Sequence, residues 1–118
     1  GNEAQILKEE SVQTMLSSTN RENKMKNLET SSPPLTEDMI IMAEIEKSWS
    51  PGFMINHETS QSGRPEESAG WAGLFNSFFW IDTKNNMVSV ILMQMLPFLE
   101  KGCVETLEDF ESSIYKDI

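Results

Sequence analysis

The sequence has few of the residues on which common catalytic and metal-binding sites depend. Its 118 residues include one cysteine, one histidine and one tyrosine. A single cysteine forms no internal disulfide, and without a cluster of Cys and His residues we expect no metal and no cofactor. Cys103 precedes a helical pattern, where a helix N-terminus can lower the pKa of a thiol. The single histidine, His57, lies in a polar stretch and offers it no catalytic partner.

Basic residues are also scarce, and long apolar runs are missing. Nine Lys and Arg stand against 19 Asp and Glu, which gives a formal net charge of -10. Nucleic acids and anionic membranes attract clustered cations, so we expect neither as a partner. The longest apolar run, Met87 to Leu96, is interrupted by Ser89 and Gln94 and is too short to span a bilayer.

Several motifs that mark hydrolytic or nucleotide-binding sites are missing as well. Tyr115 is followed by Lys116 and Asp117, so there is no Tyr-x-Asn or Tyr-x-Ser. Gly-x-Ser-x-Gly, a phosphate-binding P-loop and His-Glu-x-x-His are absent. We expect no Ser-x-x-Lys active site either, in which a lysine one helical turn after the serine acts as its base. The chain is therefore expected to lack a nucleophile of its own.

The chain divides into a polar helix and linker segment, residues 1–48, and a second part with strands and a terminal helix, residues 49–118, in which residues 70–99 are the most apolar. In the first part, residues 7–16 have a helical apolar pattern, and residues 17–36 form a polar linker that ends in two prolines. Residues 38–46 fit a helix and a strand equally well.

The second part predicts strands followed by a helix. We expect a short strand over 49–56, a loop over 57–69, a strand over 70–82, a turn over 83–86 and a second strand over 87–95. Both alternate sets of side chains in 70–82 are largely apolar, so this strand is predicted to be covered on both faces.

The last segment, about 107–116, predicts an amphipathic helix. Its apolar stripe consists of Val104, Leu107, Phe110 and Ile114. The nearest surface for that stripe is the preceding hairpin. The sequence therefore predicts an α+β fold in which the terminal helix lies across a hairpin of strands.

An ordered series of motifs in the second part resembles one family of proteins. These motifs are Trp49-Ser50-Pro51-Gly52-Phe53-Met54-Ile55-Asn56, Gly63-Arg64, Trp71-Ala72-Gly73-Leu74, Asn76-Ser77-Phe78-Phe79-Trp80-Ile81-Asp82, Met93-Gln94-Met95-Leu96-Pro97-Phe98, Phe110-Glu111 and Ile114-Tyr115. Together they resemble the C-terminal portion of a serine hydrolase of the class C β-lactamase-like type, a family that includes esterases. The clear resemblance covers residues 49–118, and Ile6-Leu7, Ser11-Val12 and Met15 fit an upstream helix of that family more loosely.

The resemblance implies a fold and a set of site residues. The fold is the β-lactamase/transpeptidase-like fold, an antiparallel sheet flanked by helices, of which this chain is a fragment. Trp71, Ala72 and Gly73 stand where classical β-lactamases carry Lys-Thr-Gly, and would line the wall of the active-site cleft that binds substrate. The backbone N–H of Leu74 would be one of two oxyanion-hole donors.

The resemblance also implies what the parent protein does. It would hydrolyse esters or small amides through an acyl-enzyme, with nucleophile, lysine and tyrosine base upstream of this chain. The partners of these residues would then be a small-molecule substrate and the remainder of the hydrolase domain. The alternative is a free-standing, non-catalytic interaction module derived from such a hydrolase. Exact substrate, compartment and oligomeric state are left open.

Overall fold

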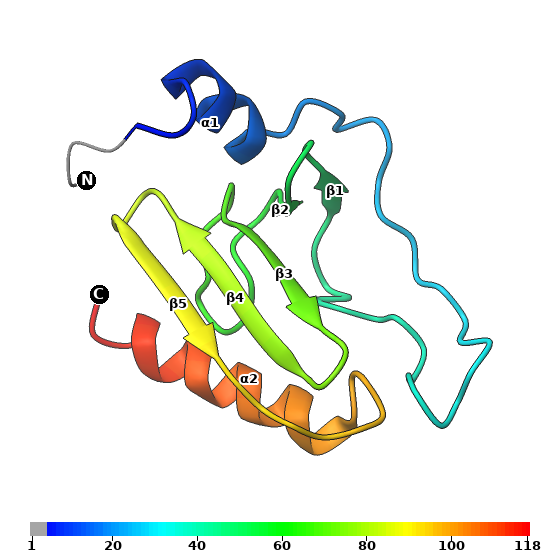
Figure 1. Ribbon diagram of the computed structural model, residues 1–118. Helices are drawn as coiled ribbons and strands as arrows, with labels where there is room; N and C mark the ends of the chain where they lie inside the picture. Colours follow the sequence, from blue (N-terminus) through cyan, green and yellow to red (C-terminus); the bar gives the residue numbers. More distant parts are fainter. Residues whose placement is uncertain (1–4) are drawn as a thin grey trace.

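The computed structural model describes residues 5–118, which form an α+β domain with one antiparallel sheet and two helices (Figure 1). The sheet has five strands in the order in which they follow along the chain: β1 (Lys47–Trp49), β2 (Met54–Asn56), β3 (Ala69–Gly73), β4 (Ser77–Asp82) and β5 (Met87–Ile91). The helices are α1 (Glu9–Leu16) and α2 (Lys101–Tyr115). Neither helix of the described residues is long and apolar enough to cross a membrane.

The segment 70–82 is two strands and not the single strand that its apolar run predicts. Residues 74–76 turn the chain back, so that β3 pairs with β4 from Ala69 opposite Ile81 to Gly73 opposite Ser77. Asn76 has a φ of 64°, a left-handed conformation that asparagine tolerates better than most residues. Its side-chain amide donates to the carbonyls of Met95 and Pro97, at 3.0 and 2.9 Å. The turn is thus fixed by acceptors about 20 residues further along the chain.

The segment 49–56 is also broken, into the end of β1 and the whole of β2. The backbone N–H of Ser50 donates to the carbonyl of Phe53, and the Ser50 Oγ accepts from the Phe53 N–H, both at 2.9 Å. These bonds close a tight turn around Pro51 and Gly52. The prediction of one strand over 49–56 was wrong because this turn divides the segment.

Other sequence-based expectations are confirmed. Residues 83–86 form the turn between β4 and β5, with Asn86 at a φ of 52°. Helix α1 lies within the predicted 7–16.

Strand β5 is shorter than expected, since it ends at Ile91 and not near residue 95. Most of residues 38–46, for which a helix and a strand were equally expected, lies in neither.

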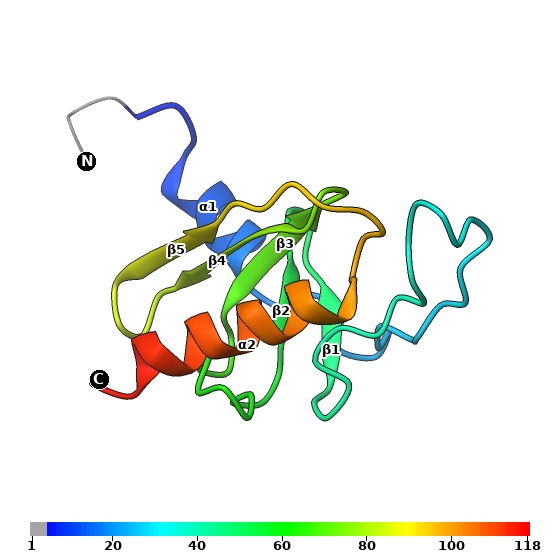
Figure 2. The same ribbon diagram turned by 90° about the horizontal axis from the view of Figure 1, so that it is seen from below.

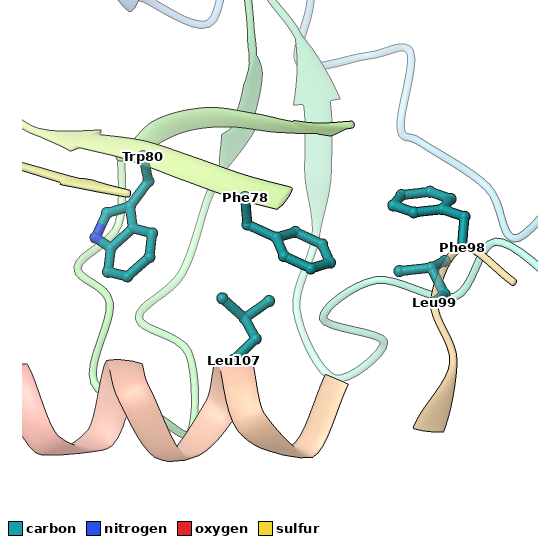
Figure 3. Close-up of a cluster of buried hydrophobic side chains, with 5 residues drawn as sticks. All are labelled: Phe78, Trp80, Phe98, Leu99 and Leu107. Carbon is teal, nitrogen blue, oxygen red and sulfur yellow. The ribbon is translucent and has the colours of Figure 1, made fainter. Parts of the chain in front are cut away.

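Helix α2 packs across the sheet as its apolar stripe predicts, although it begins at Lys101, earlier than expected. The carboxylate of Glu100 caps it by accepting from the Cys103 N–H at 2.9 Å. Figure 3 shows two side chains of β4, Phe78 and Trp80, pointing toward the helix, and Leu107 pointing back at them. Phe98 and Leu99, just before the helix, complete this core.

The opposite face of the sheet has only a partial cover (Figure 2). On this outer face β4 presents Phe79 and Ile81, which are half-buried, and β5 presents Val88 and Val90, which are 64% and 54% exposed. Helix α1 lies on this side but buries none of its residues. Within residues 5–118, β4 is therefore covered on its α2 face and only in part on its outer face, so the expectation of cover on both faces is met in part.

Four of the sequence motifs meet where the loop before β3 packs on α2. The guanidinium of Arg64 forms an ion pair with the carboxylate of Glu111 and lies 4.4 Å from the ring centroid of Trp80. Gly63, with a φ of 96°, places its Cα against Tyr115, where an added Cβ would lie 2.7 Å from the Tyr115 Cβ. Loop, sheet and terminal helix are thus tied together on the α2 side.

Candidate functional site

The Trp71–Leu74 segment lies at an open edge of the sheet. Strand β3 pairs with β4 along its whole length, but with β2 only at Ala69 and Gly70. Strand β2 is short because the chain has already turned at residues 50–53. The backbone of Trp71, Ala72 and Gly73 therefore has a ladder partner on one side only, as the edge of a sheet does.

Leu74 follows this open edge and opens the turn between β3 and β4. The turn is closed by the Asn76 N–H, which donates to the Gly73 carbonyl at 3.0 Å. Among residues 5–118, no atom accepts a hydrogen bond from the Leu74 N–H. The residue is 49% exposed. A backbone donor without an acceptor, at an exposed strand end, is free to bind an anionic oxygen.

Gly73 is a glycine that the packing of this chain does not require. A Cβ built on it would find its nearest neighbours at 3.9 Å, an ordinary contact distance, and its φ is not positive. Gly70 on the same strand differs, because a Cβ there would lie 2.5 Å from the Phe79 carbonyl oxygen. Glycine in a strand also marks sites where a ligand approaches the backbone closely. Gly73 is the position in β3 that fits this second explanation.

The side chains of the segment point to different surroundings. The Trp71 ring meets the Trp49 ring in a T-shaped contact, with centroids 4.5 Å apart. Ala72 lies opposite Phe78 and packs against the core beneath α2. Leu74 is buried neither beside the two Trp rings nor in the core beneath α2. Trp49, which the sequence gave no separate role, thus joins Trp71 in an aromatic wall at the open edge of β3.

The sequence indicated that His57 lies in a polar stretch, but the structure shows its side chain to be buried. It follows β2, its side chain is 8% exposed, and its Nε2 lies 2.8 Å from the Ser48 Oγ. Its Nδ1 lies 3.7 Å from the Glu67 Oε1, too far for a hydrogen bond. The order Ser, His, acid is that of a hydrolytic triad. However, Ser48 is 0% exposed and its Oγ lies 3.0 Å from the Ser18 Oγ, so no substrate reaches it.

Cys103 is also buried, which corrects the idea of an activated thiol. It lies in the first turn of α2, where the helix N-terminus favours a thiolate. Burial nevertheless raises its pKa, and the negative charge of Glu100 raises it further. The thiol therefore stays protonated near neutral pH and packs beside Met95, with a sulfur–sulfur distance of 3.7 Å.

One Ser-x-x-Lys spacing does occur, at Ser113–Lys116, although no active site of this type is expected. Ser113 lies in the last turn of α2, and its Oγ donates to the Phe110 carbonyl at 2.8 Å. The carbonyl end of a helix disfavours a developing alkoxide. Leu74 lies two residues before Asn76. The Asn76 Oδ1 accepts from the Leu99 N–H, and Leu99 lies just before α2 begins. Leu74 is therefore near the N-terminal end of α2, whereas Ser113 is at the opposite end. The structure does not bring this serine to the β3 edge.

No metal centre is found in the described part of the chain, where no three His, Cys, Asp or Glu side chains gather suitably. Comparison of the chain with protein-family models, with curated proteins and with solved structures gave no match in any of the three.

Proposed function

We propose that this chain is the C-terminal part of a serine hydrolase of the class C β-lactamase-like type. The observation that carries the proposal is the end of β3. There the Leu74 N–H has no acceptor among residues 5–118, and it follows a glycine that packing does not require. This pairing of a free donor with close backbone access is what an oxyanion hole needs.

In the proposed mechanism, β3 forms one wall of the active-site cleft. A serine upstream of this chain attacks the carbonyl carbon of the substrate, and the carbonyl oxygen becomes a tetrahedral oxyanion. The Leu74 N–H and a backbone N–H at the nucleophile donate to that oxyanion. The acyl-enzyme is then hydrolysed by water. One such donor lowers the transition-state free energy by about 3–4 kcal/mol.

The substrate class follows from the side chains at the wall. Trp71 provides an aromatic ring and Gly73 open backbone, the Ala72 methyl is turned toward the core, and none of the three carries a positive charge. A β-lactam carboxylate calls for a cationic or hydroxyl partner of the Lys-Thr type. Esters or small amides with uncharged acyl groups are therefore the proposed substrates.

The outer face of the sheet supports the proposal that more of a hydrolase domain packs on these residues. Phe79, Ile81, Val88 and Val90 form a continuous apolar surface there, with α1 covering only part of the sheet. Contiguous apolar surface of this kind marks an interaction site. In the proposed β-lactamase/transpeptidase-like fold, helices of the missing remainder would cover it.

The same face supports a second candidate, a free-standing interaction module without catalysis. A module would use the surface formed by Phe79, Ile81, Val88 and Val90 to bind a separate protein. The two candidates differ in what the Leu74 N–H does, because a module has no use for a free donor at the end of β3.

The test is a structure of a hydrolase that contains these residues together with an upstream nucleophile, inhibited by an alkyl phosphonate. We expect the phosphonate oxygen within about 3.2 Å of the Leu74 nitrogen, the upper limit of a good hydrogen bond. A longer distance would exclude Leu74 as a donor and favour the module.

Kinetics provide a second readout in the same protein. Leu74→Ala keeps the backbone donor and should retain most of kcat. Leu74→Pro removes the donor, and kcat should fall about 10²–10³-fold or more. Equal activity of the two variants would contradict the proposed role.

A further inference from the structure

A cleft lies between residues 40–44 and α2, on the side of the sheet away from Val88 and Val90. Its volume is about 250 Å³. We call it the α2 cleft. Figure 3 shows three of its apolar residues, Phe78, Leu99 and Leu107, facing one another. Ile41 and Val104 also line it. The inner part of the α2 cleft is therefore a surface that favours an apolar group.

The wall formed by residues 40–44 is fixed in place from behind. The buried Lys47 donates from Nζ to the carbonyl of Met42 and, at 2.8 Å, to the carbonyl of Ile45. The Ile45 N–H also donates to the Met42 carbonyl, at 3.2 Å. These bonds tie the turn at residues 42–45, and with it this wall of the cleft, to β1.

The mouth of the α2 cleft is acidic. It continues into a polar hollow of about 290 Å³, and the two share Glu44, Ser62 and Glu108, with Asp109 at the rim of the hollow. Within residues 5–118, these three carboxylates form no ion pair, and no Lys or Arg lines either space. The Glu111 carboxylate at the inner end is already neutralised by Arg64. The negative charge of Glu44 also acts on the buried Lys47 ammonium, so the carboxylates at the mouth without a nearby cation among residues 5–118 are Glu108 and Asp109.

Ser62 adds to the same polarity. Its hydroxyl donates to the Glu111 Oε2 at 2.8 Å and can accept from the Ser60 Oγ at 3.3 Å, so a lone pair is what remains for a ligand. Ser62 and the carboxylates at the mouth are therefore acceptors, and the ligand they suit is a donor with positive charge.

We propose that the α2 cleft binds a small amphipathic cation, a primary alkylammonium, with its chain against Leu99 and Leu107 and its ammonium between Glu44 and Glu108. The apolar chain leaves water on binding, whereas the ammonium stays at the mouth and remains partly hydrated. This arrangement avoids the large cost of burying an unpaired charge. This proposal does not rest on the proposed hydrolase function.

The test is an NMR titration of the chain with n-hexylammonium, compared with n-hexanol, hexanoate and methylammonium. We expect hexylammonium to bind most tightly and to shift the backbone resonances of 41–44 and 104–111. Added salt should weaken it, because the carboxylates at the mouth are exposed. Hexanol binding as tight as hexylammonium would show that the carboxylates have no role. Methylammonium binding as tight would show that the apolar part is not used.

Variants locate the site. An exposed ion pair contributes about a two- to fivefold gain in affinity. Glu44→Gln combined with Glu108→Gln should therefore weaken hexylammonium binding about four- to 25-fold. The matched control is Glu105→Gln on the same helix, since Glu105 faces Lys101 and does not line the cleft. An equal loss in the control would reduce the interaction to general attraction to an acidic protein and overturn the proposal.

A substitution that fills the α2 cleft tests the role of its apolar part. Val104→Phe should abolish hexylammonium binding while circular dichroism shows an unchanged fold. If Val104→Phe disturbs the fold, the series of ethyl-, butyl- and hexylammonium on the natural chain decides the point, because affinity should then rise with chain length. Affinity independent of chain length would overturn the proposal.

Discussion

Arg64 and Glu111 form a buried ion pair that joins the loop before β3 to the middle of α2. Their side chains are 7% and 3% exposed, and Ser62 donates a further hydrogen bond to Glu111. Burial lowers the pKa of Arg64 to about 10, so the guanidinium remains charged at neutral pH. Both residues belong to motifs of the family resemblance, and the structure gives them a role in holding the helix on the sheet.

Breaking this pair should destabilise the chain strongly. Arg64→Met leaves the Glu111 carboxylate buried without a counter-charge, and we expect the free energy of unfolding to fall by about 3–5 kcal/mol in urea denaturation. Arg64→Met combined with Glu111→Leu should cost less than the single change. The control is Lys84→Ala, which breaks the exposed pair with Glu66 and should cost less than about 1 kcal/mol. Similar losses for Arg64→Met and Lys84→Ala would contradict the buried pair.

Tyr115 can be titrated by itself, because the chain contains one tyrosine. Burial and the neighbouring Asp82 carboxylate, which accepts from its hydroxyl at 3.1 Å, together raise its pKa to about 12. The unfolded pKa is about 10. Since the folded pKa is the higher one, this contribution to stability is complete below about pH 10 and is lost as the pH rises toward 12. Tyrosinate absorbance should show the late midpoint, and Asp82→Asn should lower it. A midpoint at the ordinary value in the folded chain would refute the buried hydrogen bond.

Substitution by alanine should affect stability differently at the two glycines of β3. Gly73→Ala meets no close atom, so the free energy of unfolding should change by less than about 0.5 kcal/mol. Gly70→Ala forces a Cβ against the Phe79 carbonyl and should cost about 1–3 kcal/mol. In a hydrolase that contains these residues, Gly73→Ala should lower kcat/KM although it leaves the fold intact. Unchanged kcat/KM would remove the functional reason for Gly73.

The chain by itself should not hydrolyse p-nitrophenyl esters above background. The Ser113–Lys116 pair lies at the carbonyl end of α2, and the Ser48 hydroxyl is inaccessible. The measurement is the rate of p-nitrophenolate release, with Ser113→Ala and Ser48→Ala as controls. Saturable turnover that one of these variants abolishes would show that the corresponding serine is a nucleophile after all.

The outer face of the sheet should bind a hydrophobic dye. Val88→Thr with Val90→Thr makes that face more polar without touching the core beneath α2, so dye fluorescence should fall while the unfolding midpoint changes little. The matched control is Ile91→Thr on the other face of β5, where the side chain packs against the core and the change should destabilise the chain. Dye binding that Val88→Thr and Val90→Thr leave unchanged would place the exposed apolar surface elsewhere.

The sequence by itself determined the features that depend on near neighbours. The stripe of Leu107, Phe110 and Ile114 predicts α2 and its packing because residues three and four apart share a helix face. The asparagines at 85 and 86 predict the β4–β5 turn because their own backbone preferences suffice. The α+β class follows from the order of such local patterns.

The tertiary structure decided the features whose partners are far apart in the chain. The break at residues 74–76 depends on acceptors supplied by Met95 and Pro97, which no local pattern reveals. The buried side chain of His57 has its partner in Ser48, on the neighbouring strand. Strand β2 pairs with β3 only at Ala69 and Gly70, so it offers no acceptor to the Leu74 N–H, which is left free. Each of these depends on a hydrogen bond that is either made or left unmade by a distant segment, so only the folded chain could reveal it.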